Sequence, residues 1–123
     1  MQLFKQISIF LCLGILFVCG NHSATIESQD AMIFLDDVNY YFLDVRTIKE
    51  HENKSIPSTD CIPVQELEER IDELNKHRKK KIIVYCRSGN RSSNAVRILN
   101  ENGFNAFNMI GGMNGWEGET IKK

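Results

Sequence analysis

The apolar residues of this chain gather in short runs that predict strands. Residues 41–45 form an apolar, partly aromatic run, and residues 82–85 are four apolar residues in succession, mostly β-branched. An unbroken apolar run of this length is typical of a strand that is covered on both faces. Residues 61–62, just before Pro63, and residues 104–110 predict two further strands.

Helical patterns occur between these runs. Val64, Leu67, Ile71 and Leu74 recur at steps of three and four, which places them on one face of an α-helix. Acidic residues near the start of this segment and basic residues near its end complement a helix dipole. The segment that begins at Val64 is therefore the most strongly predicted helix of the chain.

Three shorter helices are predicted from caps and composition. Residues 28–35 form a leading helix, and Thr47 is the N-cap of a helix that continues through Glu52. Ser92 or Ser93 caps a third helix, which Gly103 ends. Strands that alternate with helices predict an α/β fold, with a parallel sheet covered by helices on both faces.

Size and charge narrow the range of functions. The chain has 123 residues, which suits one domain, and its 42% hydrophobic and 25% charged residues are an ordinary globular balance. The formal net charge is −1, so nothing in it indicates nucleic acid or an anionic membrane surface as a partner.

The first 24 residues have a different character and predict a signal peptide. Lys5 is the only charged residue before Glu27, and residues 7–18 form an apolar run shorter than the roughly 20 residues that a spanning helix needs. Cleavage after Gly20 or after Ala24 fits the small residues there, which leaves residues 25–123 as the folded domain. We therefore expect an exported, periplasmic protein. The alternatives are an uncleaved N-terminal anchor that tethers the domain to the membrane and, more weakly, a lipid anchor at Cys19.

Two of the four cysteines, Cys61 and Cys86, lie in the predicted domain. In an oxidising compartment two cysteines often pair, so a structural Cys61–Cys86 disulfide is one interpretation. The chain contains no Cys/His cluster with metal-ligand spacing, and we therefore expect no metal site.

The segment 86–91, Cys-Arg-Ser-Gly-Asn-Arg, offers a more specific chemistry for Cys86. It lies between a predicted buried strand and the start of a helix, where ligands bind in parallel sheets. The unpaired N–H groups of a helix start face an anion, and Arg87 and Arg91 add positive charge. Both effects favour the thiolate over the thiol, so we expect the pKa of Cys86 to lie below that of free cysteine. Such a thiolate is a nucleophile without a histidine base.

Four motifs resemble those of single-domain rhodaneses. The segment 86–92, Cys-Arg-Ser-Gly-Asn-Arg-Ser, is similar to their active-site loop, and Leu-Asp-Val-Arg at 43–46, followed by Glu50, is similar to their first strand signature. The two Ile-Pro pairs at 56–57 and 62–63 resemble the elements that flank the third strand of these proteins. The Gly-Gly-Met-Asn-Gly-Trp at 111–116 is similar to their closing Gly-Gly-x-x-x-Trp. The four motifs occur in the family's order and extend over most of the predicted domain.

The resemblance implies a three-layer fold with a mostly parallel sheet of about five strands. It implies a sulfurtransferase that moves sulfane sulfur from a donor such as thiosulfate, through a persulfide on Cys86, to cyanide or a thiol. No cofactor is implied, and the partners are a small anionic donor and a thiophilic acceptor. Cys86 is the expected catalytic residue, and the expected substrate-binding residues are those of the following loop: Arg87, Ser88, Gly89, Asn90 and Arg91.

Other functions and roles remain as alternatives. A rhodanese-like domain also serves as a slow or non-catalytic sulfur-binding or protein-interaction module. Phosphatase chemistry is disfavoured because the related Cys-x5-Arg loop would require arginine at Ser92. By resemblance, Asp44 and Arg46 form a buried structural pair, and Cys61 is a small residue near a sheet edge. We expect a packing role for His51.

Overall fold

The structure is a computed structural model that describes residues 24–123. The predicted signal peptide therefore lies outside the described residues except for Ala24. No helix within residues 24–123 combines the length and the apolar character needed to cross a membrane.

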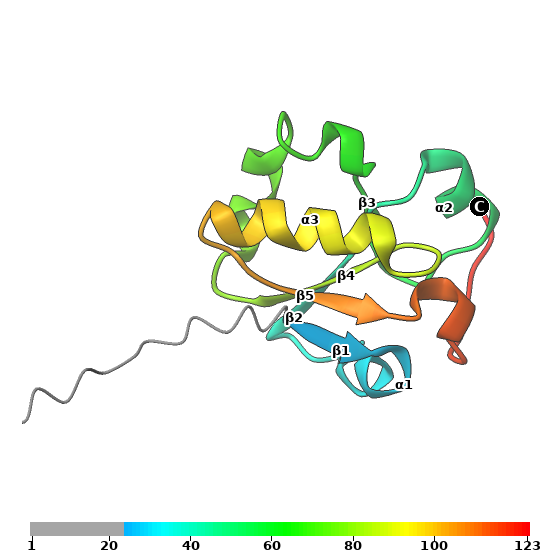
Figure 1. Cartoon of the computed structure of the whole chain (residues 1–123). Coiled ribbons are helices and arrows are strands. Elements are labelled where there is room, and N and C mark those ends of the chain that lie inside the picture. Colours follow the sequence, from blue (N-terminus) through cyan, green and yellow to red (C-terminus); the bar gives the residue numbers. More distant parts are fainter. Residues whose placement is uncertain (1–23) are drawn as a thin grey trace, which may run out of the picture.

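Five strands form one sheet in which every pairing is parallel (Figure 1). Their order across the sheet is β1-β5-β4-β2-β3. The bounds are β1 Thr25–Glu27, β2 Tyr40–Asp44, β3 Asp60–Cys61, β4 Lys81–Tyr85 and β5 Asn105–Ile110. This confirms the predicted parallel sheet, although β1 was not predicted from the sequence.

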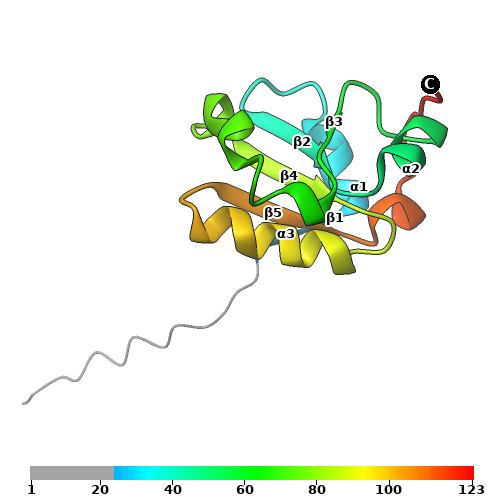
Figure 2. The same cartoon turned by 90° about the horizontal axis from the view of Figure 1, so that it is seen from above.

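Helical segments cover both faces of the sheet, as Figures 1 and 2 show. The helix α3, Asn90–Glu101, lies on one face together with two 3₁₀ segments, η2 Val64–Glu66 and η3 Ile71–His77. The other face is covered by α1, Ser28–Ala31, the 3₁₀ turn η1, Met32–Phe34, and the 3₁₀ turn η4, Gly112–Gly115, whose neighbour Trp116 joins that core. A short helix, α2 Ile48–Asn53, follows β2.

The central strand β4 shows why its sequence is an unbroken apolar run. Ile82 and Val84 belong to the core under α3, whereas Ile83 and Tyr85 belong to the core on the opposite face. All four side chains are fully buried. Burial on both faces removes the need for an alternating pattern.

The prediction of an α-helix from Val64 onward is wrong in the type of helix. The structure has the two separate 3₁₀ segments η2 and η3, and most of the local hydrogen bonds run from residue i to i−3, as from Leu67 to Val64. In a 3₁₀ helix, residues three apart lie on the same side, so the spacing Val64–Leu67 and Ile71–Leu74 suits it as well as an α-helix. The step of four, from Leu67 to Ile71, spans the turn between the two segments. Leu67 and Leu74 are buried, so the predicted apolar face is present.

The structure confirms one of the two helix N-caps predicted from the sequence and contradicts the other. Thr47 caps α2 as predicted, in a capping box with Glu50. The helix α3, however, begins at Asn90, two to three residues before the predicted serine caps. Its N-cap is Gly89, whose φ of 114° allows the loop to turn directly into the helix.

Candidate active site

Cys86 follows β4 directly, at the carboxyl edge of the sheet. Its side chain belongs to the core under α3, and the residue is only 1% exposed. The position agrees with the general location of ligand sites in parallel sheets. The thiol is thus held in a protected position between a rigid strand and a helix N-terminus.

The loop after Cys86 directs backbone N–H groups at the sulfur. The N–H of Gly89 donates to Cys86 Sγ at 3.1 Å. The left-handed conformation of Gly89 makes this turn compatible with the immediate start of α3. Hydrogen bonds from the backbone of Ser88 and Ser92 also favour the charged form of the sulfur.

A second group of contacts involves two polar side chains near the sulfur. The Ser92 hydroxyl lies 3.3 Å from Cys86 Sγ and donates to Asn108 Oδ1 at 2.6 Å. The Asn108 side chain in turn donates through Nδ2 to the carbonyl of Gly89 at 3.1 Å. Asn108 therefore ties together two residues of the loop that surrounds Cys86.

These donors decide the ionisation of Cys86. Burial acts to raise the pKa of the thiol, but the Ser92 side chain and the backbone N–H groups of Ser92, Gly89 and Ser88 together outweigh it. The pKa of Cys86 is consequently lowered from its ordinary value. A buried sulfur with a lowered pKa is suited to nucleophilic chemistry.

The two arginines of the loop have different surroundings. Arg91 forms a two-pronged ion pair with Glu50 of α2, with N–O distances of 2.7 and 3.0 Å. This pair holds the pKa of Glu50 at about 2. The expected free charge at Arg91 is therefore engaged by Glu50, although the charge of Cys86 still raises the pKa of Arg91. The exposed Arg87 makes no ion pair with any residue of 24–123.

The turn η4 fixes the beginning of the loop from the other side. The N–H groups of Met113 and Asn114 donate to the carbonyls of Cys86 and Arg87 at 2.9 and 3.0 Å. Gly112 makes this approach possible, because a Cβ atom there would meet the Cys86 carbonyl oxygen and lie 2.7 Å from the Arg87 carbonyl carbon. The closing glycine pair thus contributes to the geometry around Cys86.

A buried charged cluster lies beneath α2. Arg46 donates to both carboxylate oxygens of Asp44, with the shortest contact 2.8 Å, and to the carbonyl of Lys54 at 2.6 Å. His51 Nδ1 lies 2.9 Å from Asp44 Oδ2. This confirms the buried Asp44–Arg46 pair, and it gives His51 a polar partner in addition to the predicted packing role.

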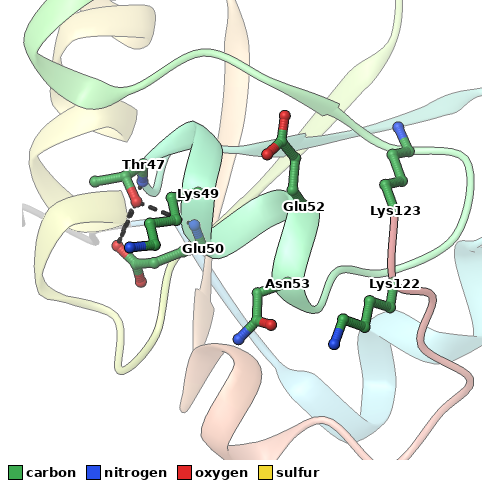
Figure 3. Close-up of a pocket in the computed structure, with 7 residues that line it drawn as sticks. All are labelled: Thr47, Lys49, Glu50, Glu52, Asn53, Lys122 and Lys123. Atoms are coloured by element: carbon green, nitrogen blue, oxygen red, sulfur yellow. Dashed lines mark hydrogen bonds between the residues drawn. The ribbon is translucent and has the colours of Figure 1, made fainter.

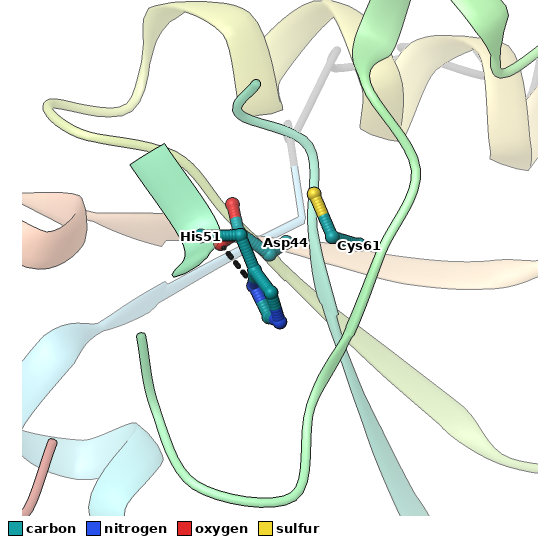
Figure 4. A group of neighbouring side chains, drawn as sticks. All are labelled: Asp44, His51 and Cys61. Carbon is teal, nitrogen blue, oxygen red and sulfur yellow. Dashed lines mark hydrogen bonds and ion pairs between the residues drawn. The ribbon is translucent and has the colours of Figure 1, made fainter. Parts of the chain in front are cut away.

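Cys61 lies beside this cluster, as Figure 4 shows. Asp44, His51 and Cys61 bring potential metal-ligand atoms within 4.8 Å of one another. However, the Arg46 guanidinium occupies both oxygens of Asp44, so a cation there would face a fixed positive charge. The arrangement fits a structural ion cluster better than a metal site.

The interpretation of Cys61 and Cys86 as a disulfide is wrong, since both thiols are free. Cys61 belongs to β3 and Cys86 follows β4, and β2 lies between these two strands in the sheet. Cys61 Sγ instead lies 3.4 Å from the carbonyl oxygen of Arg46. Burial and the charge of Asp44 raise the pKa of Cys61 to about 12, which leaves it a weak nucleophile.

A hollow of about 450 Å³ adjoins α2 on the side of the C-terminal segment. The segment is held there by an antiparallel bridge between Ser55 and Ile121 and by a hydrogen bond from Lys123 N–H to the Glu52 carbonyl. Figure 3 shows the side chains that line the hollow: Thr47, Lys49, Glu50, Glu52, Asn53, Lys122 and Lys123. Three lysines and two glutamates are among these residues, so the hollow carries charges of both signs.

Two residues near the sulfur were not predicted in their observed roles. The sequence predicts Ser92 only as a candidate helix cap and Asn108 only as part of a strand. The available signal was weak: Asn108 is a polar residue two positions from the buried Ala106, on the strand face toward α3. An asparagine at such a position requires partners, which only the fold identifies.

Comparison with known proteins identifies the family of this chain. The family model described as "Rhodanese-like domain" matches residues 25–119. The chain is 39% identical over 87 residues to "Putative sulfurtransferase YtwF" of Bacillus subtilis, a match that covers 71% of this chain and 82% of YtwF. It is 36% identical over 110 residues to "Putative sulfur carrier protein YrkF" of the same organism, covering 82% of this chain and 58% of YrkF. The chain thus spans little more than half the length of YrkF.

A solved structure has the same fold. The crystal structure of a rhodanese-related protein from Thermoplasma volcanium superposes with a TM-score of 0.74 at 32% sequence identity. The match covers 81% of this chain and 99% of that protein.

Proposed function

The chain belongs to the rhodanese-like domain family, and we propose that it is a sulfurtransferase in which Cys86 carries sulfur as a persulfide. The observation that carries this proposal is the environment of the Cys86 sulfur. It is buried, its pKa is lowered, and it receives hydrogen bonds from the loop backbone. Similarity to YtwF and YrkF supports sulfur transfer or sulfur carriage as the chemical class.

The proposed reaction has two displacement steps. The Cys86 thiolate attacks the outer sulfur of thiosulfate, a new S–S bond forms, and sulfite leaves with the electron pair of the broken bond. The outer sulfur of the resulting persulfide carries the negative charge. Cyanide or a thiolate then attacks that sulfur, and the Cys86 thiolate leaves. No cofactor is needed for this exchange. The total charge of the reactants equals that of the products in each step.

The loop residues have matching roles in this proposal. The backbone of Arg87, Ser88, Gly89, Asn90 and Arg91 binds the persulfide, because N–H groups at a helix start stabilise an anion. The exposed charge of Arg87 attracts an anionic donor toward the site. Arg91 contributes mainly by holding α2 against the loop through Glu50.

We also infer that the protein is exported to the periplasm. The short apolar run at 7–18 after Lys5 supports this. Cleavage after Gly20 suits the fold better than cleavage after Ala24, because the Ala24 carbonyl accepts a hydrogen bond from the N–H of Asn108 at 2.8 Å. N-terminal sequencing of the protein from a periplasmic fraction tests this, and an uncleaved chain in the membrane fraction would contradict it.

A slow sulfur-carrying module is the second candidate function. The 1% exposure of Cys86 favours it, because an acceptor has little direct access to the sulfur. Similarity to YrkF, which is named as a sulfur carrier, points the same way.

Steady-state transfer from thiosulfate to cyanide tests the proposed enzyme. We expect turnover by the wild type and none by Cys86→Ala. Cys61→Ser is the matched control, and it should retain full activity because Cys61 is free and has a high pKa. Activity in Cys86→Ala, or its loss in a folded Cys61→Ser variant, would contradict the proposal.

A further inference from the structure

Asn108 is the polar residue that links the central sheet to the loop around Cys86. It lies on β5, on the same strand face as the buried Ala106, and is itself partly buried. Its two side-chain hydrogen bonds go to Ser92 and Gly89. Neither bond reaches the sulfur directly, so any effect of Asn108 on Cys86 acts through these two residues.

The orientation of the Asn108 amide is fixed by its partners. The Gly89 carbonyl can only accept a hydrogen bond, so the amide nitrogen must face it, at 3.1 Å. The amide oxygen then faces Ser92, whose hydroxyl donates to it at 2.6 Å. The reversed amide would place two oxygens against each other at Gly89.

Ser92 has a single hydroxyl proton, and two acceptors lie within its reach. When Cys86 is a neutral thiol, its S–H donates to Ser92 Oγ, and Ser92 donates to Asn108, so all three groups are satisfied. When Cys86 is a thiolate, the sulfur becomes an acceptor and draws the Ser92 proton toward itself. The partly buried oxygen of Asn108 then loses its donor, which carries a free-energy cost.

We propose that Asn108 is a positioning residue that competes with the Cys86 sulfur for the Ser92 proton and thereby favours sulfur-loaded Cys86 over the empty thiolate. In the persulfide the charge lies on the outer sulfur, and Sγ is a weak acceptor. The Ser92 proton returns to Asn108, and the bond lost in the thiolate is restored. The part of this proposal that concerns the persulfide rests on the proposed function, whereas the part that concerns the thiol does not.

A double-mutant cycle tests the competition on the free thiol. The pKa of Cys86 is measured from thiolate absorbance in wild type, Asn108→Leu, Ser92→Ala and the double variant, all with Cys61→Ser. With Ser92 present, Asn108→Leu should lower the pKa enough to raise the thiolate fraction about threefold below the midpoint. In the Ser92→Ala background, Asn108→Leu should not lower the pKa of Cys86, because the hydroxyl proton for which Asn108 and the sulfur compete is absent.

The cycle separates competition from mere support of the loop. Loss of the Gly89 contact affects both backgrounds equally, so it cancels in the comparison. The proposal would be overturned if Asn108→Leu changed the pKa of Cys86 equally in the two backgrounds. It would also be overturned if Asn108→Leu raised the pKa of Cys86 when Ser92 is present. Asn105→Leu on the exposed end of the same strand is the matched control and should leave the pKa unchanged. Asn108→Ala replaces the leucine variant if the latter does not fold.

Sulfur loading provides an independent readout. Wild type and Asn108→Leu are equilibrated with a fixed thiosulfate-to-sulfite ratio at alkaline pH, where both hold Cys86 as thiolate, and the loaded fraction is read by intact mass. The ratio of loaded to empty protein should fall in the variant by the same factor of about three, since both measurements report the same lost bond. An unchanged or larger ratio would overturn the proposal. If wild type does not load at all, the proposed function fails, while the thiol cycle remains a valid test of the competition.

Discussion

At the scale of single residues, the central feature is a thiol activated by hydrogen-bond donors and not by a base. The two histidines among residues 24–123 are engaged elsewhere. His51 contacts Asp44, and His77 stacks on Tyr41 with ring centroids 3.6 Å apart. The lowered pKa of Cys86 instead comes from Ser92 and the loop backbone.

Removal of the Ser92 hydroxyl should raise the pKa of Cys86, because the burial that opposes ionisation would remain. Ser92→Ala should therefore react several-fold more slowly with iodoacetamide at neutral pH, and the midpoint of its pH–rate profile should move upward. The exposed neighbour Ser93 offers a matched control, and Ser93→Ala should keep the wild-type profile. Identical profiles for wild type and Ser92→Ala would show that the hydroxyl has no influence on the sulfur.

The sequence predicted only the local part of this site. A strand, a cysteine and a glycine-containing loop before a helix are adjacent in the chain, so a helix start facing the sulfur was foreseeable. The contacts of Arg91 with Glu50 and of Ser92 with Asn108 join residues 41 and 16 positions apart. Such pairs depend on how elements pack, and the basic charge expected at Arg91 was consequently overestimated.

At the scale of elements, the close approach of η4 to the end of β4 fixes the start of the loop. Gly112→Ala would force a Cβ atom against the backbone of Cys86 and Arg87, in addition to the strain of a φ of 51°. We expect a loss of about 3 kcal/mol or more in the free energy of unfolding, and loss of sulfur transfer. Urea unfolding and the transfer assay measure the two effects.

Gly103→Ala is the control for the strain alone. Gly103 also has a positive φ, of 83°, but a Cβ there would come no closer than 3.5 Å, to the Arg78 side chain. This variant should lose only about 1–2 kcal/mol and retain its transfer activity. If Gly112→Ala behaved like Gly103→Ala, the contact between η4 and the loop would not matter for the site.

The ion pair between Glu50 and Arg91 joins α2 to α3. The pKa of Glu50 is lowered from an ordinary 4.5 to about 2, so the pair stabilises the fold above pH 4.5 and its contribution is lost as the pH falls toward 2. Because a third of each side chain is exposed, we expect Glu50→Gln to lower the free energy of unfolding by only about 1 kcal/mol at neutral pH. The difference in unfolding free energy between Glu50→Gln and wild type should shrink as the pH falls from 4.5 toward 2.

Glu52→Gln on the same helix is the control, because Glu52 makes no ion pair among the described residues. Its unfolding free energy should follow that of wild type at every pH. A Glu50→Gln effect that stayed constant from neutral to acidic pH would mean that it does not arise from the ion pair.

Element types were predictable where the pattern had a single interpretation. The buried strand β4 and the capping box at Thr47 gave such patterns. The spacing from Val64 to Leu74 did not, because steps of three suit a 3₁₀ helix as well as an α-helix. The three-residue edge strand β1 is stabilised by pairing with β5, which no local pattern reveals.

At the scale of the whole molecule, the parallel sheet places the chemistry of distant segments at one edge. The segments that follow β2, β4 and β5 supply α2, the Cys86 loop and η4 respectively. The Cys86 loop is bonded to both of the others, to α2 through Arg91 and Glu50 and to η4 through backbone hydrogen bonds. The alternation of strands and helices predicted this α/β architecture, and the four motifs predicted the family. The identity of the donor and acceptor does not follow from either.

The most direct test of the account is the intact mass of the protein after incubation with thiosulfate alone. We predict that wild type and Cys61→Ser gain the mass of one sulfur atom, that cyanide removes it, and that peptide mapping locates it on Cys86. Cys86→Ala should gain nothing. A wild-type protein with free thiols that gained no sulfur, or a Cys86→Ala protein that still gained it, would contradict the claim that Cys86 carries sulfur from thiosulfate.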